Sequence, residues 1–133
     1  MTESIVFGDG VETVRDFLVG QFPNTKIASK VPNPRPPEFF VLRRVGGVSR
    51  NIITDEVTLA VEAWAPSKPE AHDLLQSARA AIAAMPSLEG NPVCRVTEFA
   101  GPADLPDLNS SHDRSTYTVS VALGGATSVT ITT

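Results

Sequence analysis

Residues 53–85 constrain the fold of this 133-residue chain most, because they join a clear strand pattern directly to a clear helix pattern. Positions 53, 57, 59, 61 and 63 are apolar, and most residues between them are polar. This period of two is typical of a strand with one buried and one solvent-exposed face. From Ala71 to Met85, apolar residues recur at helical spacing, which predicts an amphipathic helix. Each element needs an apolar surface to cover, so we expect the two to pack together.

The predicted helix begins with a capping box, Ser67-Lys68-Pro69-Glu70. The side chain of Ser67 is expected to accept a hydrogen bond from the backbone N–H of Glu70, and Glu70 to reach back to the N–H of Ser67. Pro69 removes only a donor that has no partner in the first turn of a helix. The start of this helix is therefore well specified.

The remaining pattern predicts a second helix and several strands. The expected elements are a helix over 10–21, strands over 26–31, 39–45, 92–99 and 114–123, a proline connector over 32–37, and loops over 46–47 and 101–113. Residues 38–65 then form a long antiparallel hairpin. Two helices and a mainly antiparallel sheet predict an α+β fold, a two-layer sandwich with both helices on one face.

The glycine pair at 124–125 divides the chain into a single domain, residues 1–125, and a C-terminal tail, residues 126–133. The tail has strong β propensity and no charge. We expect it to be frayed or paired with another chain.

Composition narrows the class of protein. Hydrophobic residues make up 41% of the chain and charged residues 20%, which favours a globular over a disordered protein. The net charge of −4 argues against binding nucleic acid through bulk electrostatics, although a local basic patch is compatible with it. The single cysteine, Cys94, cannot form an internal disulfide, and we find no signal peptide or membrane-spanning run. We expect an intracellular protein that does not bind a membrane.

No set of residues has the spacing of a catalytic or metal site. The histidines, His72 and His112, are isolated in the sequence, and neither His-x-x-His nor Cys-x-x-Cys occurs. Glu56 and Glu62 lie on the polar face of the 53–65 strand, where carboxylates are usually solvated. We therefore expect no enzyme activity, no catalytic residue, no cofactor and no metal.

Arginines are concentrated near the tip of the predicted hairpin. Four of them, in an otherwise acidic chain, fall within residues 35–50: Arg35, Arg43, Arg44 and Arg50. A solvated hairpin explains this equally well. The sharper interpretation is a docking surface for an acidic partner, since arginine is enriched at interfaces and pairs with carboxylates through two hydrogen bonds.

Apolar residues also fall on both faces of the predicted sheet. Phe39 and Phe40 are adjacent, so they point to opposite faces, and Trp64 points away from Val61 and Ala63. Two helices cover only one face, which predicts that the other is buried against a neighbour. Candidate interface residues are therefore Phe40 and Trp64, together with the four arginines, and self-association is the simplest explanation.

The chain resembles the tail terminator (minor tail) proteins of long-tailed bacteriophages with non-contractile tails. The resemblance covers roughly residues 8–124 and concerns the order of the elements, their lengths and short stretches of sequence. It is carried by the helix at 8–18, the run at 34–41, the Arg-Arg-Val-Gly-Gly at 43–47, the strand ending in Trp64-Ala65, the alanine-rich helix to Ala84 and the strand at 114–119.

The resemblance implies a small α/β sandwich without catalytic residues. It implies a structural virion protein, assembled in the host cytoplasm, whose homohexameric ring caps the head-proximal end of the tail tube. Its partners would be other copies of itself, the tail tube protein and the head–tail connector. DNA would pass through the ring without specific binding, because a mostly acidic channel neutralises few phosphates.

Two other classes remain open. One is a small ligand-binding protein or enzyme with a pocket between sheet and helices near Trp64. The other is a regulatory protein that binds nucleic acid through the arginines, which the net negative charge disfavours.

Overall fold

The computed structural model describes residues 2–4, 10–45, 49–50, 54–106, 112–124 and 129–131. The helices are α1 (Gly10–Gln21), α2 (Lys68–Ala84) and the short 3₁₀ helix η1 (Met85–Ser87). The strands are β1 (Thr2–Ser4), β2 (Lys26–Ala28), β3 (Phe39–Arg44), β4 (Ser49–Arg50), β5 (Thr54–Ala65), β6 (Val93–Pro106), β7 (Asp113–Gly124) and β8 (Val129–Ile131).

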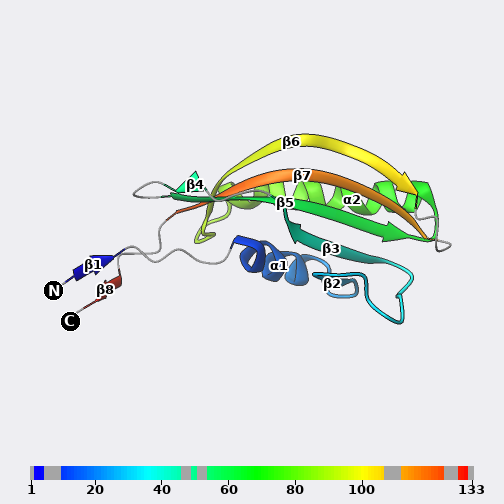
Figure 1. The fold of residues 1–133 in the computed structure, drawn as a ribbon, viewed down its shortest axis with the longest axis horizontal. Coiled ribbons are helices and arrows are strands. Elements are labelled where there is room, and N and C mark those ends of the chain that lie inside the picture. Colours follow the sequence, from blue (N-terminus) through cyan, green and yellow to red (C-terminus); the bar gives the residue numbers. More distant parts are fainter. Residues whose placement is uncertain are drawn as a thin grey trace.

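The main sheet has the strand order β2-β3-β5-β7-β6, with β4 also paired to β5. Strand β2 is parallel to β3, and the other pairs are antiparallel. Figure 1 shows β5, β7 and β6 as long, curved strands, with α1 and α2 beside them. The predicted α+β class and the antiparallel pairing of residues 39–44 with the following long strand are confirmed.

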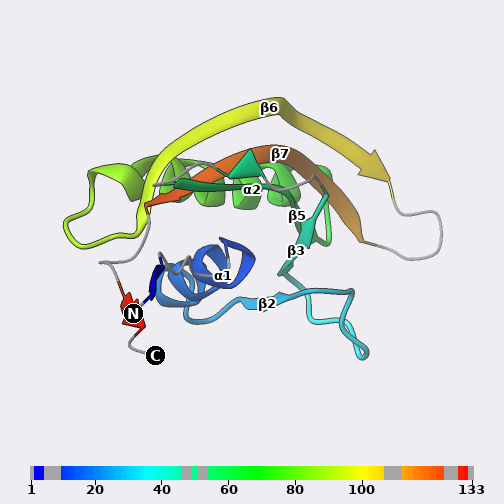
Figure 2. The ribbon, with the colours of Figure 1, turned by 60° about the vertical axis from the view of Figure 1, so that its left-hand side comes forward.

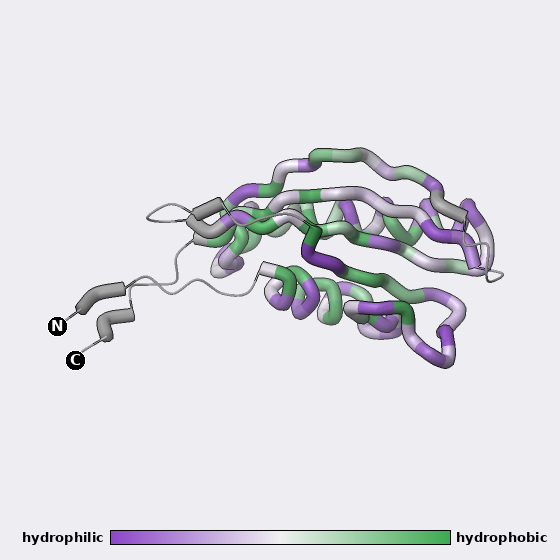
Figure 3. The backbone as a smooth tube through the Cα atoms, in the orientation of Figure 1, coloured by the Kyte–Doolittle hydropathy of each residue, from purple (hydrophilic) through white to green (hydrophobic). Residues whose placement is uncertain are grey.

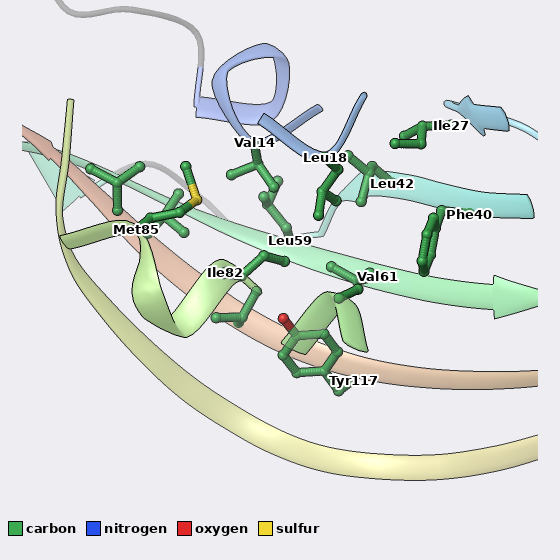
Figure 4. Close-up of a cluster of buried hydrophobic side chains, with 14 of the residues drawn as sticks. Val14, Leu18, Ile27, Phe40, Leu42, Leu59, Val61, Ile82, Met85 and Tyr117 are labelled. Carbon is green, nitrogen blue, oxygen red and sulfur yellow. The ribbon is translucent and has the colours of Figure 1, made fainter. Parts of the chain in front are cut away.

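Both helices pack on the same face of this sheet. Alternate β5 residues from Val57 to Ala63 join one buried cluster with residues from α1, α2 and β7. Figure 4 shows Val14 and Leu18 of α1 and Ile82 of α2 converging on Leu59 and Val61 of β5. Because buried apolar area drives folding, this cluster is the main source of stability.

The N-terminus of α1 approaches the sheet very closely. A Cβ built on Gly10 would overlap Cγ1 of Val57, whereas one built on Gly20 meets nothing within 4 Å. Only a residue without a side chain allows α1 to begin so near β5.

The start of α2 is close to the prediction, with one difference. Ser67 is the N-cap, and its Oγ accepts a hydrogen bond from the backbone N–H of Glu70 at 3.4 Å. The carboxylate of Glu70 accepts a hydrogen bond from Ser67 Oγ at 3.1 Å. The return bond was instead expected to run to the backbone N–H of Ser67.

Strand β6 is much longer than predicted. Residues 101–106, expected to lie in a loop, continue the strand beside β7. The sequence Gly101-Pro102 looks like a strand breaker, but register shifts between Glu98 and Ala103 absorb it. A bulge leaves residues unpaired, so a proline there costs no ladder hydrogen bond.

The C-terminal tail also differs from the prediction. Val129–Ile131 pairs with Thr2–Ser4 of the same chain in a separate two-stranded antiparallel sheet. Figure 1 places β1 and β8 apart from the main sheet. A partner for the tail is thus present at the N-terminal end of the same chain, which local sequence patterns could not reveal.

Candidate docking surfaces

The face of the sheet opposite the helices has its own small apolar cluster. It consists of Phe39, Val41 and Trp64, with Val31 packed against them. Trp64 is only 3% exposed. The hydrophilic segment between β2 and β3 contains the proline connector (Figure 3). It contributes Arg35, whose guanidinium carbon lies 5.3 Å from the centre of the Trp64 ring. The prediction that these apolar residues are exposed for a neighbour is therefore wrong.

A carboxylate and a second arginine lie against Trp64, and another arginine lies beside that carboxylate. Its indole N–H donates to Oε1 of Glu62 at 3.1 Å, and Glu62 is 7% exposed. Arg114 lies over the Trp64 ring at 5.1 Å, and Arg43 and Arg114 approach the Glu62 carboxylate at 3.6 and 3.8 Å. Glu62 was expected to be solvated. It is instead buried among cations, because its neighbours come from strands distant in sequence.

His112 helps to hold the proline connector in place. Its Nε2 lies 3.1 Å from the carbonyl oxygen of Pro36, and its ring is 5.9 Å from that of Phe39. This histidine, isolated in the sequence, thus lies at a contact between the start of β7 and the connector. The contact joins segments that no local pattern links.

The six predicted interface residues fall into three groups. Arg35, Arg43 and Arg44 are exposed. Phe40 is wrongly predicted as an interface residue, because it is fully buried on the helix-facing side, with its ring edge-on to Phe22 at 5.2 Å. Trp64 is covered as described, and the side chain of Arg50 lies outside the described residues.

The rest of this sheet face is polar. Glu56 on β5 accepts a hydrogen bond from Ser120 at 2.8 Å and another from Arg95 at 3.3 Å. Between this network and Trp64 lie small side chains, among them Thr58 and Thr118, both half-buried. The arrangement ties β5, β7 and β6 together across the outer face.

Strand β6 forms one edge of the sheet, and β7 is the only described strand that pairs with it. Figure 2 shows it arching along the outside of β7. Phe99, at a bulge in this strand, is 64% exposed. Cys94, on the same strand, is an exposed free thiol whose Sγ lies 3.3 Å from the carbonyl oxygen of Ala122.

An ion pair links β6 to α2. Arg79 donates to Glu98 through Nε at 2.5 Å and through Nη2 at 2.7 Å. Hydrogen bonding to Arg79 lowers the pKa of the Glu98 carboxyl, and the same bond raises the pKa of Arg79. Nearby, burial raises the pKa of Tyr117, whose hydroxyl has no hydrogen-bond partner among the described residues. The Arg79–Glu98 pair holds α2 against β6.

The open hollows on the described surface include the following three. One of about 580 Å³ lies between α1 and residues 85–92, one of about 430 Å³ between α1 and residues 26–29, and one of about 280 Å³ beside α2 and Glu38. None of the three includes Trp64, where a ligand pocket was considered.

The described residues contain no group of three or more His, Cys, Asp or Glu side chains able to hold a metal ion. In the described part of the chain, no helix is both long and apolar enough to span a membrane. No protein-family model matches the chain, and no curated protein matches it in sequence.

Proposed function

We propose that the protein is a structural subunit of a phage tail, which caps the tail tube as a homo-oligomeric ring, hexameric by its resemblance to tail terminators, and joins it to the head-side connector. No catalytic step belongs to this role. The role requires two binding surfaces, one for the last ring of the tail tube and one for the head–tail connector protein.

The observation that carries the proposal is the free edge of β6. This strand runs from Val93 to Pro106, and among described strands only β7 pairs with it. Long unpaired edges are normally shortened, charged or covered, because they recruit other strands. Phe99, the most exposed large apolar residue in the described part of the chain, lies on this strand. A neighbouring subunit would cover both the edge and the phenyl ring.

The outer sheet face supports a role in protein contact in a second way. The proline connector is fixed over Trp64 by Arg35 and by the contact of His112 with Pro36. A surface segment that is already held in place loses little conformational entropy when a partner binds it. The proline connector can therefore serve as a preformed contact surface for the tail tube protein or for the head–tail connector protein.

Passage of DNA through the ring is part of the proposal. The chain carries a net charge of −4, so a channel lined by its acidic residues would hold phosphates only weakly. DNA would then slide through rather than bind.

The competing proposal, a ligand-binding protein or enzyme with a pocket near Trp64, has less support. The indole is covered by Phe39, Arg35 and Arg114. A ligand there would have to displace the proline connector.

Labelling with an antibody against this chain tests the tail role. Virions from a lysate that contains the chain are imaged after gold labelling, with pre-immune serum as the control. We expect gold particles at the junction of head and tail. Label confined to the soluble fraction, with none on virions, contradicts the proposal.

A further inference from the structure

The hollow between α1 and residues 85–92, here named the α1 groove, combines apolar and acidic lining. Its volume is about 580 Å³. Phe17 and Leu88 supply apolar surface, and Leu88 is 43% exposed. The exposed carboxylates of Asp16 and Glu89 also line it, and no lysine or arginine does. The groove therefore suits a segment that carries both an apolar and a cationic side chain.

The last two residues of β3 and the residue that follows, Arg43–Val45, here named the β3 tip, carry such side chains. Val45 is 54% exposed, and the Arg43 side chain is 46% exposed. Residues two apart on an extended strand point to the same side, so Arg43 and Val45 face one direction. Nε of Arg43 is 3.6 Å from Glu62, beyond hydrogen-bonding distance, which leaves the guanidinium able to bind a second carboxylate.

The backbone of the β3 tip is also open on one side. Strand β2 pairs only with Phe39–Val41, so no described strand lies beside Arg43 on that edge. Arg43 and Arg44 remain paired with Ala60 and Leu59 of β5, so a groove would contact the open backbone edge and the exposed side chains of the tip.

We propose that the β3 tip of one copy docks into the α1 groove of a second copy. This inference rests on the self-association in the proposed function and names one contact that makes it. Val45 would cover Leu88, and Arg43 would bind Asp16 or Glu89 through two hydrogen bonds. Val45 and Leu88, two of the four exposed large apolar residues in the described part of the chain, would then bury each other.

A second copy is favoured as the occupant by charge. Copies that each carry a net charge of −4 repel one another, so a contact between them needs local opposite charge. Every copy carries one acidic groove and one basic tip, which together provide this opposite charge. A tip-to-groove contact is heterologous, and it closes into a ring when the rotation per copy divides the circle.

Charge reversal and charge exchange test this contact in the full chain. The groove variant is D16K/E89K, the tip variant is R43E/R44E, and the exchange variant carries all four substitutions. Matched controls are Lys68→Glu and Asp73→Lys, exposed charges outside both patches. Association is measured by sedimentation velocity over a range of protein concentrations, with circular dichroism to confirm folding.

We expect each reversal to weaken association by about tenfold or more, because like charges then face each other. The exchange variant should recover association, and the controls should match the wild-type chain. Unchanged association in the reversal variants, failure of the exchange variant to recover, or a monomeric wild-type chain overturns the inference.

Negative-stain imaging of the same samples separates this inference from the proposed function. Rings that persist in the reversal variants overturn the tip-to-groove contact but leave the tail-capping ring standing. Wild-type dimers that respond to charge exchange but never form rings support the contact and contradict the capping ring.

Discussion

The ring of Phe39 lies almost parallel to the indole of Trp64, with 14° between the planes and 5.4 Å between the ring centres. The two residues are directly paired across β3 and β5, so they share the outer face of the sheet. With Arg35 and Arg114 against the indole, this stack closes a face that a simple two-layer fold would leave open.

Replacement of Trp64 by alanine tests how well this second cluster is packed. We expect Trp64→Ala to lower the free energy of unfolding by about 3–5 kcal/mol, because it removes a buried indole and leaves a cavity. Urea denaturation measures the loss, with Trp64→Phe as a control that keeps an aromatic ring. A loss no larger than the roughly 0.5 kcal/mol of a surface substitution would show that the cluster is open in solution.

Two glycines of α1 should respond in opposite ways to alanine. A side chain at Gly10 overlaps Val57, so Gly10→Ala should cost about 1–3 kcal/mol of unfolding free energy. Space is open around Gly20, so Gly20→Ala should stabilise the chain by about 0.4–1 kcal/mol. Thermal denaturation of the two variants checks both signs. Equal effects would mean that α1 does not approach β5 so closely.

The N-terminal cap of α2 should contribute measurably to the free energy of unfolding. Ser67→Ala removes the side-chain acceptor for the N–H of Glu70, and we expect a loss of about 1 kcal/mol. Ser67→Asp keeps an acceptor and should lose less. Urea midpoints of the three proteins decide the point, and equal stability of wild type and Ser67→Ala would exclude the cap as a stabilising contact.

The pair between Arg79 and Glu98 predicts a particular pH dependence. The pKa of Glu98 is lower in the folded chain than its ordinary value of 4.5, so its contribution to stability is present above that pH. The contribution is lost as the pH falls through the folded pKa, because protonation breaks the pair. Glu98→Gln should therefore be less stable than wild type at pH 7, with the difference closing in acid.

Urea titrations from neutral to acidic pH measure this difference. The control is Glu38→Gln, an exposed glutamate outside both the Arg79–Glu98 pair and the α1 groove. A stability gap between wild type and Glu98→Gln that stays constant with pH would rule out a charge-based role for Glu98.

Much of the fold follows from local patterns. The alternation along β5, the helical spacing of α2 and the Ser67 cap all depend on residues within a few positions of one another. Local signals of that kind predict where elements begin, and both helices and the antiparallel hairpin lie close to the predicted positions.

Contacts between distant segments were not predictable in the same way. Trp64 is covered by the connector before β3, Glu62 is approached by Arg114 from β7, and the C-terminal strand pairs with Thr2–Ser4. The prediction of an exposed patch around Phe40 and Trp64 was therefore wrong. The arginines were correctly placed on the surface wherever their side chains are described, because exposed charge is a local property.

Imaging the purified full-length chain by electron microscopy, with its mass determined in the same buffer, tests the central claim most directly. The account predicts closed rings of identical subunits with a central hole and the mass of a hexamer. Uniform single copies at every concentration, both alone and mixed with assembled tail tubes, would contradict it.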